Sequence, residues 1–437
     1  MFLCPMSSRS KRRRAFSLFA VLLSAVLSFG VAAPALADPG LTLQEAQHLA
    51  LAQSRKLAAG DASIAAARDM AVAAGQLPDP VLKVGIDNLP VSGPDRYSLS
   101  GDFMTMRRIG VMQELPGAAK RRLRAGRFER VADKAAADKA LVGATIERDT
   151  ALAWLALYFA GATARAIDEQ VGEAGLALQS AEAGFKGGRG TLADVPAARG
   201  ALALLQERAS EAGQRVRGAR IGLARWVGPV GELAGAPDLA HVRLDAASIG
   251  SQLGHHPQIA VLEREEGVAR AQVRLAEADR QPDWSVEVAF QQRGAAYANM
   301  LSVGVSIPLQ WDRARRQDRE LAARIALADG ARAERDDALR AHVAEAQAML
   351  GDWQSGRERL ARYRGELIEL ALERSAATLA AYRGGKSSLA DMLAARRAEN
   401  DVRLQTITLD ADTATLWAQL NFMAAASHPI NAIKDSP

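Results

Sequence analysis

The chain of 437 residues contains one cysteine and few aromatic residues. Because Cys4 is alone, neither an intramolecular disulfide nor a cysteine-based zinc site can form. Phe, Trp and Tyr make up only 5% of the residues and alanine is abundant, which favours long, closely packed helices over a thick mixed core. Proline is absent from 117–195 and from 309–428, so no proline interrupts either stretch as a long helix.

Positive charge is in excess only at the start of the chain. The formal net charge is +5, and the surplus equals the five basic residues within positions 9–14. The apolar stretch Ala15–Val31 and the small-residue pattern Ala35-Leu36-Ala37 follow, before the first acid at Asp38. This order predicts a secretory signal peptide, residues 1–37, cleaved after Ala37, with an uncleaved membrane anchor as the alternative. The remaining 400 residues are formally neutral, which argues against nucleic acid as a partner, and no later segment is predicted to be a transmembrane helix.

An internal repeat divides the chain. Residues 185–199 and 382–396 are related by an offset of 197 and are identical at eight of fifteen positions. Both copies contain a glycine pair, Gly187-Gly188 and Gly384-Gly385, that allows the chain to reverse after a helix.

Two pairs of short alternating segments precede these turns, at about 80–88 and 103–115 and at about 284–292 and 299–309. The pattern fits either a half-buried sheet or the strands of a membrane barrel. Four membrane strands are too few to close a barrel, since the smallest have about eight, so a membrane sheet would have to be shared between chains.

Long helices are predicted after each strand pair, at about 118–184 and 313–381. Apolar residues four and three apart in the second helix predict a coiled-coil seam, formed by Leu339, Val343, Ala346, Leu350 and Trp353. The predicted fold is mainly α with a small membrane β part, built from a duplicated helix–strand–strand–long helix–helix unit. The first repeat covers 38–236, the second covers 237–425, and 426–437 is a tail.

From Leu41-Thr-Leu-Gln-Glu-Ala46 to about Phe422, the duplicated order and the glycine turns resemble the TolC-like outer-membrane efflux family. The resemblance implies a homotrimer in which an α-helical barrel crosses the periplasm below a shared twelve-stranded β-barrel in outer-membrane lipid. It also implies a passive exit duct that works with a periplasmic adaptor (membrane fusion protein) and an inner-membrane RND pump, with no cofactor and no enzymatic activity.

The segments Gly85–Pro90 and Asp102–Pro116 resemble the heavy-metal branch of that family, the cobalt–zinc–cadmium and copper–silver type. Two departures are Ser54-Arg55 in place of the usual Asn-Pro and the lack of a lipid-bearing cysteine after the signal peptide. A drug-efflux or type I secretion channel is the first alternative and a periplasmic coiled-coil adaptor the second. An exported enzyme is disfavoured by the repeat and by the lack of a catalytic constellation.

The resemblance places the glycine turns at the periplasmic aperture. The aperture candidates are Phe185, Asp194, Tyr382 and Asp391. Ser387 and Ala394 stand where the family pattern has an arginine and a second aspartate. Three copies of Asp391 near a threefold axis would favour cations. Alternatively, Asp194 and Asp391 cap the helices that follow the turns.

Two further motifs are weak. Gly385-Lys386-Ser387 resembles the end of a phosphate-binding loop, but Ala380 stands where that pattern requires glycine. His255-His256, followed by proline, indicates a polar loop ahead of a helix rather than a metal site.

Three methionines near the second strand, Met104, Met106 and Met112, could be soft ligands for Cu(I) or Ag(I). Their spacing places all three on one strand face. An apolar barrel or core surface is the favoured interpretation.

Overall fold

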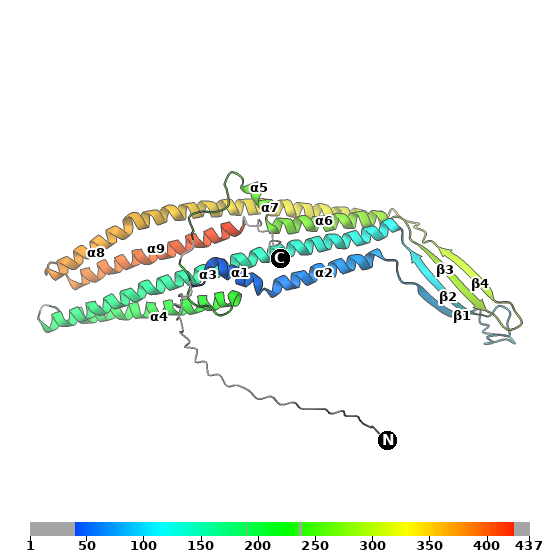
Figure 1. The fold of residues 1–437 in the computed structure, drawn as a ribbon, viewed down its shortest axis with the longest axis horizontal. Helices are drawn as coiled ribbons and strands as arrows, with labels where there is room; N and C mark the ends of the chain where they lie inside the picture. Colours follow the sequence, from blue (N-terminus) through cyan, green and yellow to red (C-terminus); the bar gives the residue numbers. More distant parts are fainter. Residues whose placement is uncertain (1–39, 189, 236–237, 424–437) are drawn as a thin grey trace, which may run out of the picture. The chain divides into compact units, whose positions relative to one another are not determined.

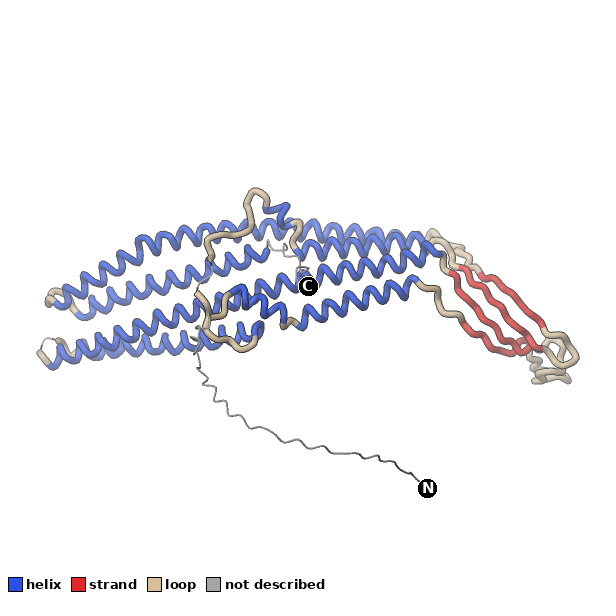
Figure 2. Tube along the Cα trace, in the orientation of Figure 1, coloured by secondary structure: helices blue, strands red, loops and turns tan. Residues whose placement is uncertain are grey.

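A computed structural model describes residues 40–188, 190–235 and 238–423. The predicted signal peptide with its cleavage after Ala37, and the tail 426–437, lie outside the described residues. The described chain is mostly helical with a small strand part, which confirms that aspect of the predicted fold class (Figures 1 and 2).

The elements follow the same order in both halves of the chain. The first half contains α1 (Leu43–Ala52), α2 (Arg55–Gly75), β1 (Val81–Asp87), β2 (Met106–Leu115), α3 (Ala118–Lys186) and α4 (Asp194–Val227). The second half contains α5 (Ile249–Leu253), α6 (Pro257–Ala278), β3 (Trp284–Gln292), β4 (Met300–Ser306), α7 (Gln317–Arg362), the π-helix η1 (Tyr363–Leu367), α8 (Ile368–Arg383) and α9 (Leu389–Met423). The π-turn η1 interrupts the single helix expected over about 313–381.

Side-chain caps explain where several helices begin. Thr42 and Glu45 form a reciprocal capping box at the start of α1. Ser54 accepts a hydrogen bond from the backbone N–H of Leu57 at 3.3 Å, so it caps α2 in place of the asparagine expected there. His256 accepts a hydrogen bond from the backbone N–H of Gln258 at 3.2 Å and caps α6. The His-His pair therefore lies ahead of a helix, as its sequence predicts.

The 69-residue helix α3 is the central element and spans about 100 Å. It packs against α1, α2 and α4 of the first half and against α6 and α9 of the second, so the halves are not separate domains (Figure 1). Among the described helices, α3 alone contains a window long and apolar enough to cross a membrane. That test also selects core helices of soluble proteins, and α3 supplies many residues of the largest core cluster.

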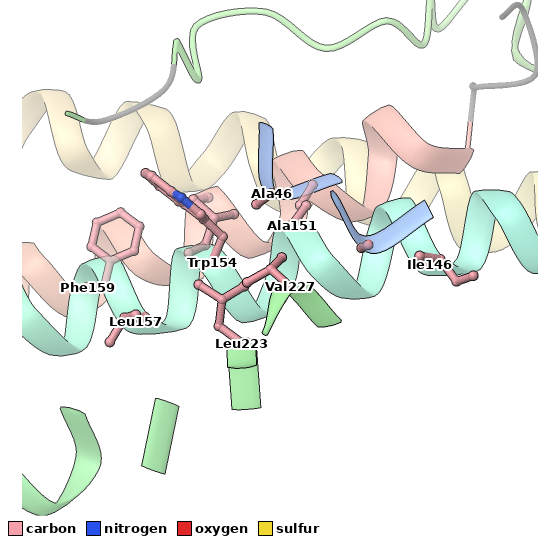
Figure 3. Close-up of a cluster of buried hydrophobic side chains, with 12 residues drawn as sticks. Ala46, Ile146, Ala151, Trp154, Leu157, Phe159, Leu223 and Val227 are labelled. Atoms are coloured by element: carbon pink, nitrogen blue, oxygen red, sulfur yellow. The ribbon is translucent and has the colours of Figure 1, made fainter. Parts of the chain in front are cut away.

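The largest core cluster surrounds Trp154 (Figure 3). The Trp154 ring is fully buried, and its indole N–H donates to the Leu41 carbonyl at 2.9 Å. Ala151 of α3 and Ala414 and Ala418 of α9 are also fully buried, and such small side chains allow helix backbones to approach closely. The abundance of alanine thus has a structural role in the packing of long helices.

The predicted seam of α7 is buried. Ala346, Leu350 and Trp353 are at most 7% exposed, and Leu339 and Val343 pack against the same cluster. Their partners include α5 and the C-terminal part of α9.

The four strands form one antiparallel sheet in the order β1-β2-β3-β4. The halves of the chain meet at the β2–β3 pair, where Ile109 lies opposite Phe290. The outer edges of β1 and β4 have no strand partner among the described residues. The sheet lies beyond the ends of α2, α3, α6 and α7 (Figure 2).

Candidate functional site

One face of the sheet is apolar and exposed. Two cross-strand rows carry it, Val84–Ile109–Phe290–Leu301 and Leu82–Val111–Val288–Val303. All eight side chains are 44–73% exposed. The rows follow from strict alternation, which sends every second residue to the same face. A soluble monomer rarely exposes a contiguous patch of this kind, so the face requires an apolar environment or a partner.

Aromatic side chains flank this apolar face at both ends. At the helix end, Trp284 is 54% exposed and Trp311 is 89% exposed. In the loops at the opposite end of the strands, Tyr97, Phe103 and Tyr297 are 38–58% exposed. Two aromatic zones separated by an apolar band are typical of strands that cross a lipid bilayer.

The opposite face of the sheet is polar. Glu287 of β3 forms ion pairs with Lys83 of β1, at 2.6 Å, and with Arg108 of β2. Arg108 also lies 3.9 Å from Asp87, so four charges cancel across three strands. Several other positions on this face have small side chains, among them Gly85, Gly110, Ala289, Ser302 and Gly304. This face therefore carries a network of ion pairs among several small side chains.

Met106 and Met112 lie on this polar face, because their positions alternate with the apolar residues of β2. The expectation that they belong to an apolar surface is wrong: the cross-strand register aligns Met112 with Glu287. Met104 precedes β2, so it does not share the strand with the other two. Within the described ranges, no group of three or more His, Cys, Asp or Glu side chains is arranged to hold a metal ion.

A buried ion cluster joins the sheet to the helices. The Lys120 ammonium, on the first turn of α3, lies 2.8 Å from Asp283 and 3.3 Å from Asp279, and it donates to the Gln281 carbonyl at 2.8 Å. Arg124 lies 3.3 Å from the second Asp283 oxygen. The cluster fixes the start of α3 against the segment between α6 and β3. No local sequence pattern indicates this cluster, because its partners lie about 160 residues apart.

At the far end of the helices, each tip turn is built on a glycine. Gly188 and Gly385 both have φ of +69°, a left-handed conformation that side chains rarely adopt. At the second tip, the N–H of Gly385 donates to the Tyr382 carbonyl and that of Lys386 to the Ala381 carbonyl. This is the Schellman pattern that ends a helix. Because α8 precedes Gly385-Lys386-Ser387, the strand required for a phosphate-binding loop is not there.

Asp391 and Ser388 form a reciprocal capping box at the start of α9, whereas Asp194 accepts a hydrogen bond from the turn that precedes α4. Asp194 accepts a hydrogen bond from the Thr191 N–H at 2.7 Å. Asp391 accepts from the Ser388 N–H at 3.1 Å and the Ser388 hydroxyl at 2.7 Å, and its own N–H donates back to that hydroxyl. Hydrogen bonds from the Ser388 side chain and backbone, and from Ser387, lower the pKa of Asp391. The capping interpretation therefore has direct geometric support at Asp391, whereas no described side chain caps the start of α4 by a hydrogen bond.

The tips differ in how they present apolar residues. Leu192 is 74% exposed, whereas its repeat equivalent Leu389 is 3% exposed. Pro196 supplies a physical reason. Because proline has no backbone N–H to donate, it is tolerated only in the first turn of a helix, and α4 accordingly begins at Asp194, two residues before it. The equivalent helix α9 has no proline there and begins at Leu389 itself.

The aromatic aperture candidates also differ. Phe185 is 44% exposed at the first tip. Tyr382 packs against a cluster that combines Ala181 and Ala198 with Leu389 and Met392 of α9. The two tips of one chain are thus joined through a common apolar cluster.

Residues 249–426 match the family model of the outer membrane efflux protein. No curated protein matches the sequence.

Several solved structures share the fold. The outer-membrane channel OprN is 18% identical with a TM-score of 0.73, and the match covers 87% of this chain and 89% of that one. CusC is 16% identical with a TM-score of 0.74, covering 87% and 91%. The outer membrane protein VceC from Vibrio cholerae is 17% identical with a TM-score of 0.71, covering 87% and 96%. The chain therefore has the fold of these outer-membrane proteins.

Proposed function

We propose that this chain is an outer-membrane channel that serves as the exit duct of a tripartite RND-type efflux system. The observation that carries the proposal is the sheet, which has an exposed apolar face between two aromatic zones and a polar face behind it. It continues from long helices in a fold shared with outer-membrane channels. The enzyme and adaptor alternatives do not account for such a sheet.

We propose a homotrimer, because the sheet has two unpaired edges and lipid offers no hydrogen bonds to them. Three copies would supply twelve strands, above the minimum of about eight for a closed barrel. The helices next to those edges also expose apolar side chains: Val72 of α2 is 66% exposed and Leu327 of α7 is 59% exposed. A head-to-tail contact of the β1/α2 side with the β4/α7 side closes into a ring when the rotation fits.

In such a ring the polar sheet face would line the pore. Its glycine, alanine and serine positions leave space, and its ion pairs balance charge. The helices would continue the duct through the periplasm toward an adaptor and an inner-membrane RND pump. The duct is passive, so energy comes from the pump, and no cofactor is required.

We propose heavy-metal cations as the exported substrates, on the resemblance of Gly85–Pro90 and Asp102–Pro116 to the metal branch. Drug efflux and type I secretion are the alternatives. Deletion of the gene followed by a tolerance panel of Co, Zn, Cd, Ni, Cu, Ag and common drugs tests this. Hypersensitivity to metals supports the assignment, and hypersensitivity to drugs alone overturns it.

For the tips, we propose that Asp391 adds cation selectivity to its capping role. Its lowered pKa keeps the carboxylate ionised at neutral pH. Asp391→Ala and Asp391→Asn should both weaken cation selectivity of purified channels in planar bilayers, and the asparagine retains a cap. Asp337→Ala, at an exposed position on α7, is the matched charge control. An unchanged reversal potential in both Asp391 variants refutes the selectivity role.

Fractionation tests the channel itself. The chain should be recovered in outer membranes as a species of trimer size. Recovery as a soluble periplasmic monomer would contradict the proposal and favour an adaptor or an enzyme.

A further inference from the structure

An arginine-rich pocket of about 270 Å³ lies among α3, α6 and α7, away from the strands and the tips. Five arginines line it, Arg130 from α3, Arg264, Arg270 and Arg274 from α6, and Arg335 from α7. We call this site the arginine pocket. The channel function proposed above gives it no role.

Helical geometry explains how these side chains converge. On α6, Glu263, Gly267, Arg270 and Arg274 are four, three and four residues apart, so they share one face. Helices α3 and α7 pack on α6, one from each side, and each contributes one arginine (Figure 1). Gly267 lines the pocket, and a Cβ added there would meet no atom within 4 Å.

Part of the positive charge is neutralised within the protein. Glu266 is 3% exposed and forms ion pairs with both Arg335 and Arg270. Arg335 also lies 2.6 Å from Asp336, whose hydrogen bond is the main cause of the raised pKa of Arg335. At the rim, Arg130 lies 2.9 Å from Asp133. These contacts fix the walls of the pocket.

The rest of the positive charge is not neutralised. Arg264 and Arg274 line the pocket, yet neither has an ion pair or hydrogen bond within the described part of the chain. The other three lining arginines are paired: Arg270 and Arg335 with Glu266, Arg335 also with Asp336, and Arg130 with Asp133. Arg264 and Arg274 therefore leave free donors in the pocket lining for an anion that enters it.

We propose that the arginine pocket binds a compact tetrahedral oxyanion of the phosphate class. Guanidinium groups hold such anions through paired, charge-assisted hydrogen bonds. A tetrahedral oxyanion offers more acceptor oxygens than a carboxylate, so it can accept hydrogen bonds from more than one guanidinium group. The volume lies below the roughly 300–1,000 Å³ of pockets for drug-sized ligands, which favours a small anion.

Isothermal titration of the full chain with inorganic phosphate, against chloride at the same ionic strength, tests the site. Binding should saturate at one phosphate per chain. The double variant Arg264→Gln/Arg274→Gln should lose at least about tenfold in affinity, since each removes charge-assisted hydrogen bonds. Both side chains are exposed and lack partners, so folding should be retained.

The matched control is Arg122→Gln/Arg319→Gln, which removes two exposed, unpaired arginines from α3 and α7 outside the pocket. This control should bind phosphate as the original chain does. Equal loss in both double variants would mean a general charge effect and overturns the proposal.

A second titration distinguishes free phosphate from phosphate on a lipid headgroup. Short-chain phosphatidylglycerol is compared with short-chain diacylglycerol, which lacks phosphate. Binding of phosphatidylglycerol that depends on Arg264 and Arg274, without binding of inorganic phosphate, assigns the site to a headgroup. Binding of neither phosphate source overturns the proposal.

Discussion

Replacing Val84 with arginine tests whether the apolar sheet face lies in a membrane. Val84 is 73% exposed and stands at the middle of β1, in the row with Ile109, Phe290 and Leu301. If this face were in water, such a surface change would alter the free energy of unfolding by less than about 0.5 kcal/mol. In a bilayer midplane, an arginine on the lipid-facing side of a barrel costs about 2–4 kcal/mol.

Assembly into a ring multiplies the free-energy cost of the substitution. A ring of three copies carries the substitution three times, so the total cost is about 6–12 kcal/mol. That range is comparable to the whole stability of an ordinary domain, about 5–15 kcal/mol. Val84→Arg should therefore strongly reduce the amount of folded channel in the outer membrane.

Val91→Arg is the matched control. Val91 is 70% exposed but lies in the segment between β1 and β2, beyond the end of the strand. Near the membrane surface the cost of arginine falls to about 0–1 kcal/mol. The measurements are immunoblots of outer-membrane fractions and urea unfolding midpoints of protein reconstituted in liposomes. Equal amounts and equal midpoints for the two variants would refute the membrane placement of the sheet.

Two further predictions concern the helices. Gly385→Ala places a side chain in a left-handed conformation and should destabilise the chain by about 1–2 kcal/mol. Gly172→Ala, within α3, is the control and should stabilise the chain by about 0.5–1 kcal/mol. Urea unfolding measures both free-energy changes, and equal effects of the two substitutions would contradict the turn geometry. Burial, with smaller contributions from His342 and Arg148, lowers the pKa of His256 to about 4. The folded state then binds fewer protons than the unfolded state, so stability is full above about pH 6.5 and declines as the pH falls toward 4. His256→Asn keeps the helix cap and should reduce this decline in the thermal midpoint between about pH 7 and pH 5; an unchanged decline would exclude His256 as its source.

Local patterns were sufficient to predict the strands, the long helices and the tip turns, but not the division of the helices before each strand pair into α1 and α2 and into α5 and α6. Alternation located the strands, and the glycine pairs located the tip turns. Boundaries were less accurate: the second long helix was expected from about 313 but begins at Gln317, and β2 was expected from residue 103 but begins at Met106. Asp102 accepts a hydrogen bond from the Met104 N–H at 2.7 Å and holds this segment in a turn. The π-turn η1 has no sequence pattern that distinguishes it from the α-helices around it.

Contacts between the halves could not be predicted in the same way. Lys120 is buried because Asp279 and Asp283 meet it from the other half, and neither spacing nor composition indicates that pairing. The methionines show the same limit. Alternation correctly placed Met106 and Met112 on one face, but the character of that face depends on the register that brings Glu287 across.

The asymmetry of the two tips has a consequence for molecular recognition. Pro196 delays the start of α4 and leaves Leu192 in solvent, whereas Leu389 is enclosed by its neighbours. The duplicated halves have therefore diverged at the tips, which in the proposed exit duct lie toward the partner proteins. In a ring of three copies, two kinds of tip alternate around the rim, so the rim has threefold rather than sixfold symmetry. Any partner that binds at this rim as identical subunits must accommodate two non-equivalent binding sites.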